Sequence, residues 1–312
     1  MLNKDEVGAL LREHDNFLVL THARPDGDTM GTGAALCYGL NKMGRTAFLF
    51  HNHQFKDNHP WIAEPYLAPE GYVPDYVVSV DTASRAMLAE GFSGKVDLAI
   101  DHHGSNTGYA ENTHVVSEKA SCAEVLMDIL RPMLGGFDKT IADLLYIAVS
   151  TDTGCFVYGN TSGDTLRAAA ELCDAGASNT ALNKILFRTS SIERLALEGM
   201  MYSTLRYYHD NKTIVSIVTR EMFEKSGAQE RDCADIAAIP GRVQGSATTV
   251  VIRELGENQC KLSVRTNGVV NASDLCAKFG GGGHAMAAGC TINQPVFEAE
   301  EQIVEAIAEA LK

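Results

Sequence analysis

The sequence has no long apolar run. A helix that crosses a bilayer needs about 18 or more consecutive apolar residues, and no stretch of the 312 residues approaches that length. The N-terminal segment also lacks the layout of a signal peptide, because Asp5, Glu6 and Glu13 interrupt its apolar positions. We therefore expect a cytoplasmic protein with no membrane partner.

Paired cysteines are also missing. The eight cysteines are scattered along the chain, with no Cys-x-x-Cys pair. Such pairs are the usual ligands of a structural zinc ion, so their absence argues against a zinc ribbon. A chain of this length can build its own core without disulfides. We expect reduced and mostly buried thiols.

Basic residues are too few for a protein that grips long nucleic acid. The chain has 26 Lys and Arg against 40 Asp and Glu, a formal net charge of −14. Proteins that bind long nucleic acids neutralise many phosphates with a basic surface. A long duplex is therefore not an expected partner. A compact anionic substrate that is held by metal ions and a few local donors remains compatible.

Internal repeats and low-complexity tracts are absent, and the length predicts two domains. The first part alternates short apolar runs with helical patterns, which is typical of an α/β domain with a mostly parallel sheet covered on both faces. In such sheets, functional residues collect beyond the carboxyl ends of the strands. The expected strands are 17–21, 46–50, 76–80 and 96–100, and the expected helices are 29–43, 120–134, 139–150 and 161–175 with an N-cap at Thr161.

The pattern changes after a helical stretch over 178–207, in which we place a connector at 188–198. The first domain is then 1–187, and a smaller α/β domain covers 199–312. Its expected strands are 213–219, 248–253 and 260–266, the last two joined by a hairpin turn at 255–258, and its terminal helix is 296–311.

A run of glycines, Gly280–Gly283, lies in the second domain. Four glycines indicate positive φ angles or a close backbone approach. Their N–H groups could hold a phosphate, aided by a helix that begins at His284, although a structural turn is the alternative. Arg265, at a strand end, is a candidate anion-binding residue, and an ordinary surface arginine is the alternative.

Acidic residues and histidines follow the carboxyl ends of three expected strands and one helix. Two of the motifs have an ordinary explanation when taken alone: Asp26-Gly27-Asp28 could be a turn, and Asp81 could cap a helix. Asp101-His102-His103 is less ordinary, because two adjacent imidazoles and an acid have no packing purpose after an apolar strand. Together they indicate metal ligands, because burying several carboxylates without cations is costly. The residues are His22, Asp26, Asp28, Asp81, Asp101, His102, His103 and Asp152.

A mixed set of imidazoles and carboxylates suits manganese, iron, zinc or magnesium, and the number of carboxylates favours manganese. Even six ligands from this set of eight residues would exceed what one open catalytic ion needs. They fit two ions about 3.5–4 Å apart that share a bridging carboxylate.

These motifs resemble those of the DHH phosphoesterase superfamily. His22–Asp28, Asp81–Ala83, Asp101–His103 and Asp152–Gly154 look like its four motifs, and Gly280–Gly289 with the strand around Arg265 resembles its DHH-associated C-terminal domain. The resemblance covers nearly the whole chain and is greatest to bacterial nano-RNases that double as pAp phosphatases. Thr32 stands where the first motif often has serine.

The resemblance implies two Mn²⁺ ions, or Mg²⁺ or another divalent ion, and an active-site cleft between the two domains. One ion would be held by His22, Asp26 and Asp81, and the other by Asp28, Asp81, His102 and Asp152, with Asp81 bridging. Asp101 would orient an imidazole, and His103 would contact the phosphate. The implied substrate-binding residues are Arg265, Gly281, Gly282, Gly283 and His284.

The expected activity is hydrolysis of short oligoribonucleotides, or nano-RNA, and linear dinucleotides to mononucleotides, and of pAp to AMP. The expected partners are short single-stranded RNA or DNA oligonucleotides and mononucleotide phosphates. Two alternatives remain open: another DHH phosphohydrolase (a single-strand exonuclease, pyrophosphatase or polyphosphatase), and a nucleotide-binding sensor without activity. The sequence also leaves open the preferred substrate, the direction of degradation and whether a homodimer forms.

Overall fold

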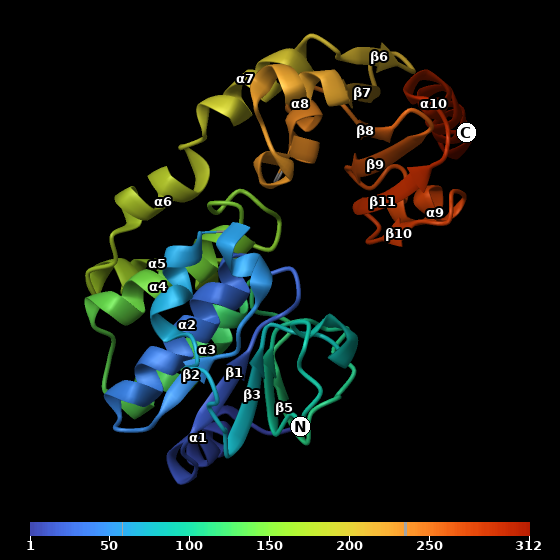
Figure 1. The fold of residues 1–312 in the computed structure, drawn as a ribbon. Helices are drawn as coiled ribbons and strands as arrows, with labels where there is room; N and C mark the ends of the chain where they lie inside the picture. Colours follow the sequence, from blue (N-terminus) through green and yellow to red (C-terminus); the bar gives the residue numbers. More distant parts are fainter. Residues whose placement is uncertain (58, 234–235) are drawn as a thin grey trace. The chain divides into compact units, whose positions relative to one another are not determined.

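The computed structural model describes residues 1–57, 59–233 and 236–312. The chain forms two compact units, residues 1–189 and 190–312, and each has its own sheet and its own core (Figure 1). The expected connector at 188–198 contains this junction and the first part of helix α7 (Ile192–Tyr202), which packs in the second unit. Among the described residues, no helix combines the length and apolar character that a membrane span requires.

The first unit contains a five-stranded sheet in which every pairing is parallel, in the order β2-β1-β3-β4-β5. The α/β expectation is thus confirmed, and one edge strand, β5, was not predicted. β1 and β3 are buried along their whole length, as continuous apolar runs in a parallel sheet require. The strands are β1 Phe17–Leu20, β2 Ala47–Leu49, β3 Tyr76–Val80, β4 Leu98–Asp101 and β5 Asn112–Val115.

α-Helices cover one face of this sheet (Figure 1). The other face is covered by an apolar cluster from loops and short 3-10 helices, including Ala68, Leu88 and Ala110, because the connections that precede β3, β4 and β5 form no α-helix. The alternating pattern therefore predicted a cover on both faces correctly, but only one cover is helical. The helices are α1 Lys4–Glu13, α2 Gly27–Lys42, α3 Cys122–Leu134, α4 Lys139–Asp152, α5 Gly163–Asp174 and α6 Asn179–Phe187.

Two local predictions in this region were wrong. The N-cap of α5 is Ser162 and not Thr161, because Ser162 and Thr165 exchange hydrogen bonds in a capping box. The helical stretch over 178–207 is two helices, α6 and α7, and it ends before strand β6 (Arg206–Tyr208).

The second unit contains a mixed six-stranded sheet in the order β10-β11-β9-β8-β7-β6. Only β7 and β8 pair in parallel, and β8 and β9 form the expected hairpin. One apolar cluster packs this sheet against α9 and α10, and another packs it against α7 and α8. The remaining elements are β7 Thr213–Val218, α8 Arg220–Ser226, β8 Thr248–Gly256, β9 Gln259–Thr266, α9 Ala272–Ala277, β10 Gly282–Gly283, β11 Ala287–Ile292 and α10 Val296–Ala310.

The glycine run forms a hairpin, so the expected helix start at His284 was wrong. Gly282 and Gly283 make up β10, which pairs antiparallel with Gly289 and Ala288 of β11. Gly283 has a φ of 148°, and a Cβ at this position would lie 2.6 Å from the carbonyl oxygen of Ala287. The glycines therefore serve a close approach of two backbones, which a residue with a side chain would prevent.

Candidate metal centre

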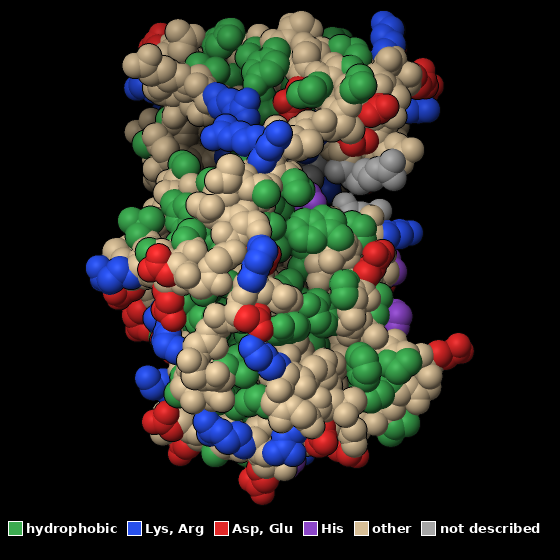
Figure 2. Space-filling view, turned by 90° about the vertical axis from the view of Figure 1, so that its left-hand side faces the viewer, with side chains coloured by type: hydrophobic (Ala, Val, Ile, Leu, Met, Phe, Trp, Pro, Cys, Tyr) green, Lys and Arg blue, Asp and Glu red, His purple; other side chains and the backbone are tan. Residues whose placement is uncertain are grey.

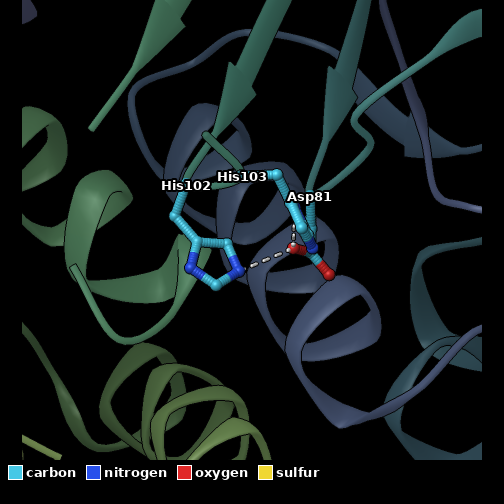
Figure 3. A group of neighbouring side chains, drawn as sticks. All are labelled: Asp81, His102 and His103. Atoms are coloured by element: carbon cyan, nitrogen blue, oxygen red, sulfur yellow. Dashed lines mark ion pairs between the residues drawn. The ribbon is translucent and has the colours of Figure 1, made fainter. Parts of the chain in front are cut away.

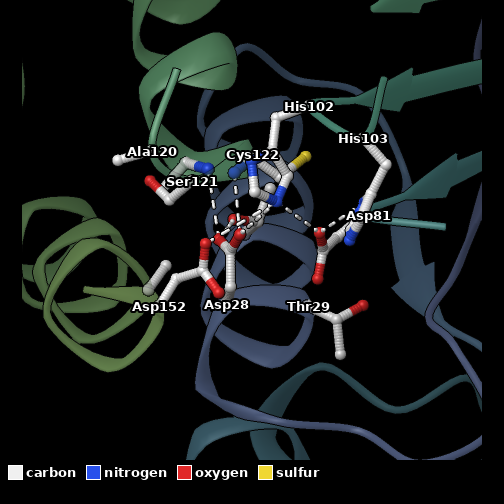
Figure 4. Close-up of polar contacts among 12 residues, drawn as sticks. Asp28, Thr29, Asp81, His102, His103, Ala120, Ser121, Cys122 and Asp152 are labelled. Atoms are coloured by element: carbon white, nitrogen blue, oxygen red, sulfur yellow. Dashed lines mark hydrogen bonds and ion pairs between the residues drawn. The ribbon is translucent and has the colours of Figure 1, made fainter. Parts of the chain in front are cut away.

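The candidate ligands meet at the carboxyl edge of the first sheet. The register places Leu20 beside Ser79 and Val80 beside Ile100, so the residues that follow β1, β3 and β4 share one edge. Helix α4 brings Asp152 to the same place in its last turn. Figure 4 shows the side chains of Asp28, Asp81, His102 and Asp152 converging there.

Three overlapping groups of side chains are close enough to hold metal ions, with ligand atoms that all lie within 4.8 Å of one another. Asp81 belongs to two groups, and so does His102. All six residues that the sequence suggested as ligands are among them, together with His103, which the resemblance placed at the phosphate. The groups are His22, Asp26 and Asp81; Asp28, His102 and Asp152; and Asp81, His102 and His103.

Asp26 is the N-cap of helix α2. Its Oδ1 accepts hydrogen bonds from the backbone nitrogens of Asp28 at 3.0 Å and Thr29 at 3.1 Å. Helix α2 then packs closely on α4: a Cβ on Gly27 would overlap the side chain of Thr151, and one on Gly31 would lie 2.5 Å from the carbonyl oxygen of Leu144. Both the capping role and the glycine contacts fix the first motif beside the end of α4.

Asp28 is buried, with 1% of its surface exposed, and it is held by donors from another helix. Its Oδ2 accepts from the backbone nitrogen of Cys122 at 2.7 Å, and its Oδ1 from that of Ala123 at 3.2 Å, both at the N-terminus of α3. The hydroxyl of Thr32 donates to Oδ1 at 2.9 Å. A threonine therefore supplies the one hydroxyl contact that a serine here could make.

Asp81 is the least satisfied carboxylate of the cluster. It is 3% exposed, its φ of 53° lies in the left-handed region, and its Oδ1 is buried without a hydrogen-bond partner. The Nε2 of His102 lies 3.3 Å from Oδ1 (Figure 3). The Nε2 of His22 lies 3.5 Å from Oδ2. A buried carboxylate oxygen that accepts no hydrogen bond is costly unless a cation neutralises it.

A backbone carbonyl on the side away from the cluster orients the His102 ring. Its Nδ1 contacts the carbonyl oxygen of Lys119 at 3.1 Å, which requires a proton on Nδ1 and directs Nε2 into the cluster. Besides Asp81, this Nε2 faces Asp152 Oδ2 at 3.7 Å and Asp28 Oδ2 at 3.8 Å. Three carboxylates around one imidazole nitrogen form an arrangement that a cation would complete.

Electrostatics in the cluster point the same way. Burial raises the pKa of Asp152 most. His102 lowers this pKa, but repulsion from Asp81 and Asp26 raises it again, and the resulting value is about 7. Burial followed by repulsion from Asp81 also raises the pKa of Asp28. Burial lowers the pKa of His22, but hydrogen bonds to Asp26 and Asp81 outweigh it and raise the value to about 10. The site thus has an excess of negative charge that binds protons when no other cation is present.

Asp101 lies outside the three groups and acts on His103. It is fully buried, and its Oδ1 accepts from His103 Nδ1 at 2.7 Å. This hydrogen bond raises the pKa of His103. The Nε2 of His103 then faces away from Asp101, and the residue lines a hollow of about 480 Å³ with Gly104 and Thr107 among other residues.

Three asparagines support the site. The side chain of Asn52 donates to the carbonyl oxygen of His22 at 2.9 Å, and that of Asn106 donates to Asp101 Oδ2 at 2.7 Å. The side chain of Asn160 donates to the carbonyl oxygens of Asp152 and Ala120, both at 3.1 Å. Sequence reasoning gave none of them a role, because asparagine in a loop is an ordinary turn residue.

The candidate substrate-binding residues form a separate group in the second unit. Arg265 on β9 pairs with Ala287 of β11, next to the point where Ala288 pairs with Gly283. Arg265, Gly282, Gly283 and His284 are exposed, and Gly281 is half-buried. The structure therefore brings these residues to one end of the second sheet, whereas the candidate ligands belong to the first unit.

Comparison with known proteins agrees with the two units. Residues 16–149 match the DHH family, N-terminal domain, and residues 210–312 match the DHHA1 domain. The chain is 31% identical to the bifunctional oligoribonuclease and PAP phosphatase NrnA of Thermus thermophilus, over 94% of this chain and 89% of that protein.

Solved structures show the same fold. An exopolyphosphatase-related protein from Bacteroides fragilis matches with a TM-score of 0.85 at 22% identity, covering 99% of this chain and 95% of that one. The exonuclease RecJ bound to manganese matches with a TM-score of 0.57 at 17% identity, covering 99% and 95%. From the paired domain matches and the extent of the similarity to the Thermus protein, the chain belongs to the DHH phosphoesterase family, in the group of bifunctional oligoribonuclease and PAP phosphatases.

Proposed function

We propose that the protein uses two divalent metal ions to hydrolyse short oligoribonucleotides, including linear dinucleotides, to mononucleotides, and pAp to AMP. The observation that carries this proposal is the buried carboxylate of Asp81, which belongs to two groups of candidate ligands and has an oxygen without a hydrogen bond. The named activities of the Thermus relative support the substrate class. The manganese in the RecJ structure supports Mn²⁺ as the metal.

The donor set fits two ions better than one. His22 and Asp26 would share Asp81 around the first ion, and Asp28, His102 and Asp152 would share it around the second. When bound, such ions supply an activated water for in-line attack on phosphorus and neutralise the charge on the phosphate oxygens. The imidazole share of the set favours manganese over magnesium, which prefers oxygen ligands.

His103 is suited to the leaving group. Asp101 holds its Nδ1 proton, and the raised pKa favours the form in which Nε2 also carries a proton. A protonated Nε2 can donate to a phosphate oxygen or to the departing alkoxide. Asp101 belongs to none of the candidate ligand groups, and its role in this proposal is to position the imidazole ring of His103.

The second unit would bind the nucleotide. Arg265 offers a guanidinium that can contact a phosphate in a bidentate manner, and the backbone of Gly282 and Gly283 is exposed beside it. We propose that Arg265, Gly281, Gly282, Gly283 and His284 hold a phosphate of the substrate other than the one that is hydrolysed.

Surface charge supports a preference for short substrates. The net charge is −14, and Figure 2 shows acidic and basic side chains interspersed over the visible face. Each additional phosphate of a long strand would therefore gain little attraction outside the site.

The decisive experiment is turnover of the dinucleotide ApA and of pAp, with products separated by chromatography. We expect AMP from both in Mn²⁺, slower turnover in Mg²⁺, and none in excess chelator. Full activity in chelator would contradict the metal mechanism. Binding of ApA without any product in Mn²⁺ would identify the protein as a nucleotide sensor instead.

A further inference from the structure

We propose that Tyr158 is a stacking platform for a nucleobase of the substrate, beside the candidate metal centre. Tyr158 follows the fourth acidic motif, and none of the roles described above involves it. The proposal deepens the proposed function, on which it rests, because it names the part of the nucleotide that the first unit recognises.

The segment that carries Tyr158 has an unusual backbone. Gly154, Cys155 and Phe156 follow one another with φ angles of 55°, 58° and 65°. Successive left-handed residues, two of them with side chains, persist only where the surrounding structure imposes them, and such strain gathers at functional sites.

Hydrogen bonds hold this segment in place. The backbone nitrogens of Val157 and Tyr158 both donate to the carbonyl oxygen of Thr153 at 3.0 Å, and that of Phe156 donates to the Thr153 hydroxyl at 3.1 Å. Thr153 itself is fully buried. The loop is therefore built on a fixed point one residue after Asp152.

The ring of Tyr158 lies against Gly154. A Cβ on Gly154 would overlap three carbon atoms of the ring, so only glycine allows this approach. Tyr158 nevertheless remains 57% exposed. An aromatic ring that lies against a glycine and is more than half exposed resembles the platforms on which bases stack in proteins that bind single strands.

Both ends of the loop are tied to the candidate centre. Asp152 begins it, and near its end the Asn160 side chain donates to the carbonyl oxygens of Asp152 and Ala120. Ala120 directly precedes the N-terminus of α3, which holds Asp28. A base on Tyr158 would thus belong to a nucleotide whose phosphate is at the cluster.

An exposed tyrosine in a loop is usually without function. Three features argue against that explanation here: the strained backbone, the glycine contact and the anchoring at Asp152. Stacking accepts any base, because every base has a π-face. The proposed platform therefore gives affinity for nucleotides with little base preference, as a general oligoribonuclease needs.

The first test compares Tyr158→Leu, Tyr158→Phe and Val157→Ala on ApA and on the corresponding dinucleotide without bases. We expect Tyr158→Leu to raise KM for ApA about 5- to 100-fold with little change in kcat, the loss that one stacked base represents. Tyr158→Phe should restore KM to within about 2-fold. Val157 is 79% exposed in the same loop, so Val157→Ala should match the wild type.

The dinucleotide without bases separates stacking from structural damage. Its KM should be the same for the wild type and for Tyr158→Leu. If Tyr158→Leu raises KM for both substrates equally, or for neither, the proposed platform is refuted. The melting temperature and Mn²⁺ affinity of each variant should equal those of the wild type, and a fall in either would assign Tyr158 a structural role.

A binding assay does not depend on turnover. Trp61 is the only tryptophan of the chain, so the double variant Trp61→Phe, Tyr158→Trp carries a single fluorescent reporter at the platform. AMP should quench its emission, and ribose 5-phosphate should not. Equal responses to the two probes would overturn the proposal. If the wild type fails to hydrolyse ApA but AMP quenches the reporter, the proposed function fails and the nucleobase site stands.

Discussion

Replacing Asp152 by asparagine should stabilise the protein without metal and destabilise it relative to the wild type in Mn²⁺. The substitution removes one negative charge and changes the shape of the side chain little. Asp152 is a suitable position because its side chain is only 28% exposed and its pKa is raised to about 7. The proposed site therefore predicts effects of opposite sign in the two conditions.

The magnitude follows from the pKa. The pKa of this carboxyl group is raised from its ordinary value of 3.8 to about 7 in the folded protein. Each pKa unit of this rise means that folding disfavours the charged form by about 1.4 kcal/mol. Because its charge is coupled to the other carboxylates, we expect about 2–4 kcal/mol at pH 8. For a unit of this size, that corresponds to roughly 4–15 °C in melting temperature.

The direction of the pKa shift of Asp152 determines how stability depends on pH. Because the folded pKa lies above the unfolded value, the contribution of this group to stability is fully present below about pH 4 and is lost as the pH rises through about 7. The metal-free wild type should therefore lose stability between about pH 4 and pH 8 more steeply than Asp152→Asn. The two proteins should differ little at pH 4.5 and most at pH 8.

Manganese should reverse the order. A ligand present at about 100 times its Kd stabilises the folded state by about 2.7 kcal/mol, and the variant lacks one proposed ligand. The assay is thermal unfolding in chelator and in Mn²⁺ at both pH values, with Asp164→Asn as the control because Asp164 is exposed, pairs with Arg167 and belongs to none of the candidate ligand groups. Asp152→Asn could be less stable than the wild type in chelator at pH 8, or it could gain as much stability from Mn²⁺ as the wild type does. Either result would contradict the proposal that Asp152 is a metal ligand in a cluster with excess negative charge.

Three further predictions concern activity. Asp81→Asn should lower kcat on ApA by at least about 10³-fold, whereas Thr82→Ala should cost far less because the Thr82 hydroxyl donates to the carbonyl oxygen of Val80 and belongs to none of the candidate ligand groups; equal losses would refute the bridging role of Asp81. Arg265→Ala should impair ApA hydrolysis much more than hydrolysis of bis-p-nitrophenyl phosphate. Equal losses on both substrates would show that Arg265 acts at the metal centre or has a structural role. On a labelled ladder from two to about twenty-four nucleotides, initial rates should be highest for two to roughly five nucleotides, with a weak salt dependence; fastest, processive degradation of the longest strand would favour the exonuclease alternative.

Much of the first unit could be predicted from the sequence because its strands are uninterrupted apolar runs. Tyr76–Val80 is β3 with the expected bounds, and the other three expected strands differ by one or two residues. β5 could not be recognised, because Asn112–Val115 is polar and half-buried at the sheet edge. The parallel topology predicted that the ligands that follow β1, β3 and β4 would meet, since carboxyl ends of parallel strands share an edge, whereas Asp152 reaches this edge from the end of helix α4.

The second unit was less predictable around its glycines. A run of four glycines indicates an unusual backbone but not which one, because glycine removes the side-chain pattern that separates helix from strand. The structure resolves the choice through pairing: Gly282 and Gly283 find partners in Gly289 and Ala288, which lie too far along the sequence for local patterns to reveal. Two of the supporting asparagines escaped detection for a similar reason, since Asn52 donates to His22 and Asn160 to Ala120, each in a distant part of the sequence.

The carboxylates of Asp26, Asp28 and Asp101 are satisfied by hydrogen bonds from the protein itself, whereas that of Asp81 is not. Asp26 accepts from the first turn of α2, and Asp28 accepts from the first turn of α3, so each faces the positive end of a helix. Asp101 accepts hydrogen bonds from His103 and Asn106. Asp81 has a buried oxygen without a hydrogen bond and a left-handed backbone that directs it into the cluster. The fold therefore holds Asp26, Asp28 and Asp101 with its own donors, and the proposed metal ions would neutralise Asp81, which is why we expect substitution of Asp81 to reduce catalysis most.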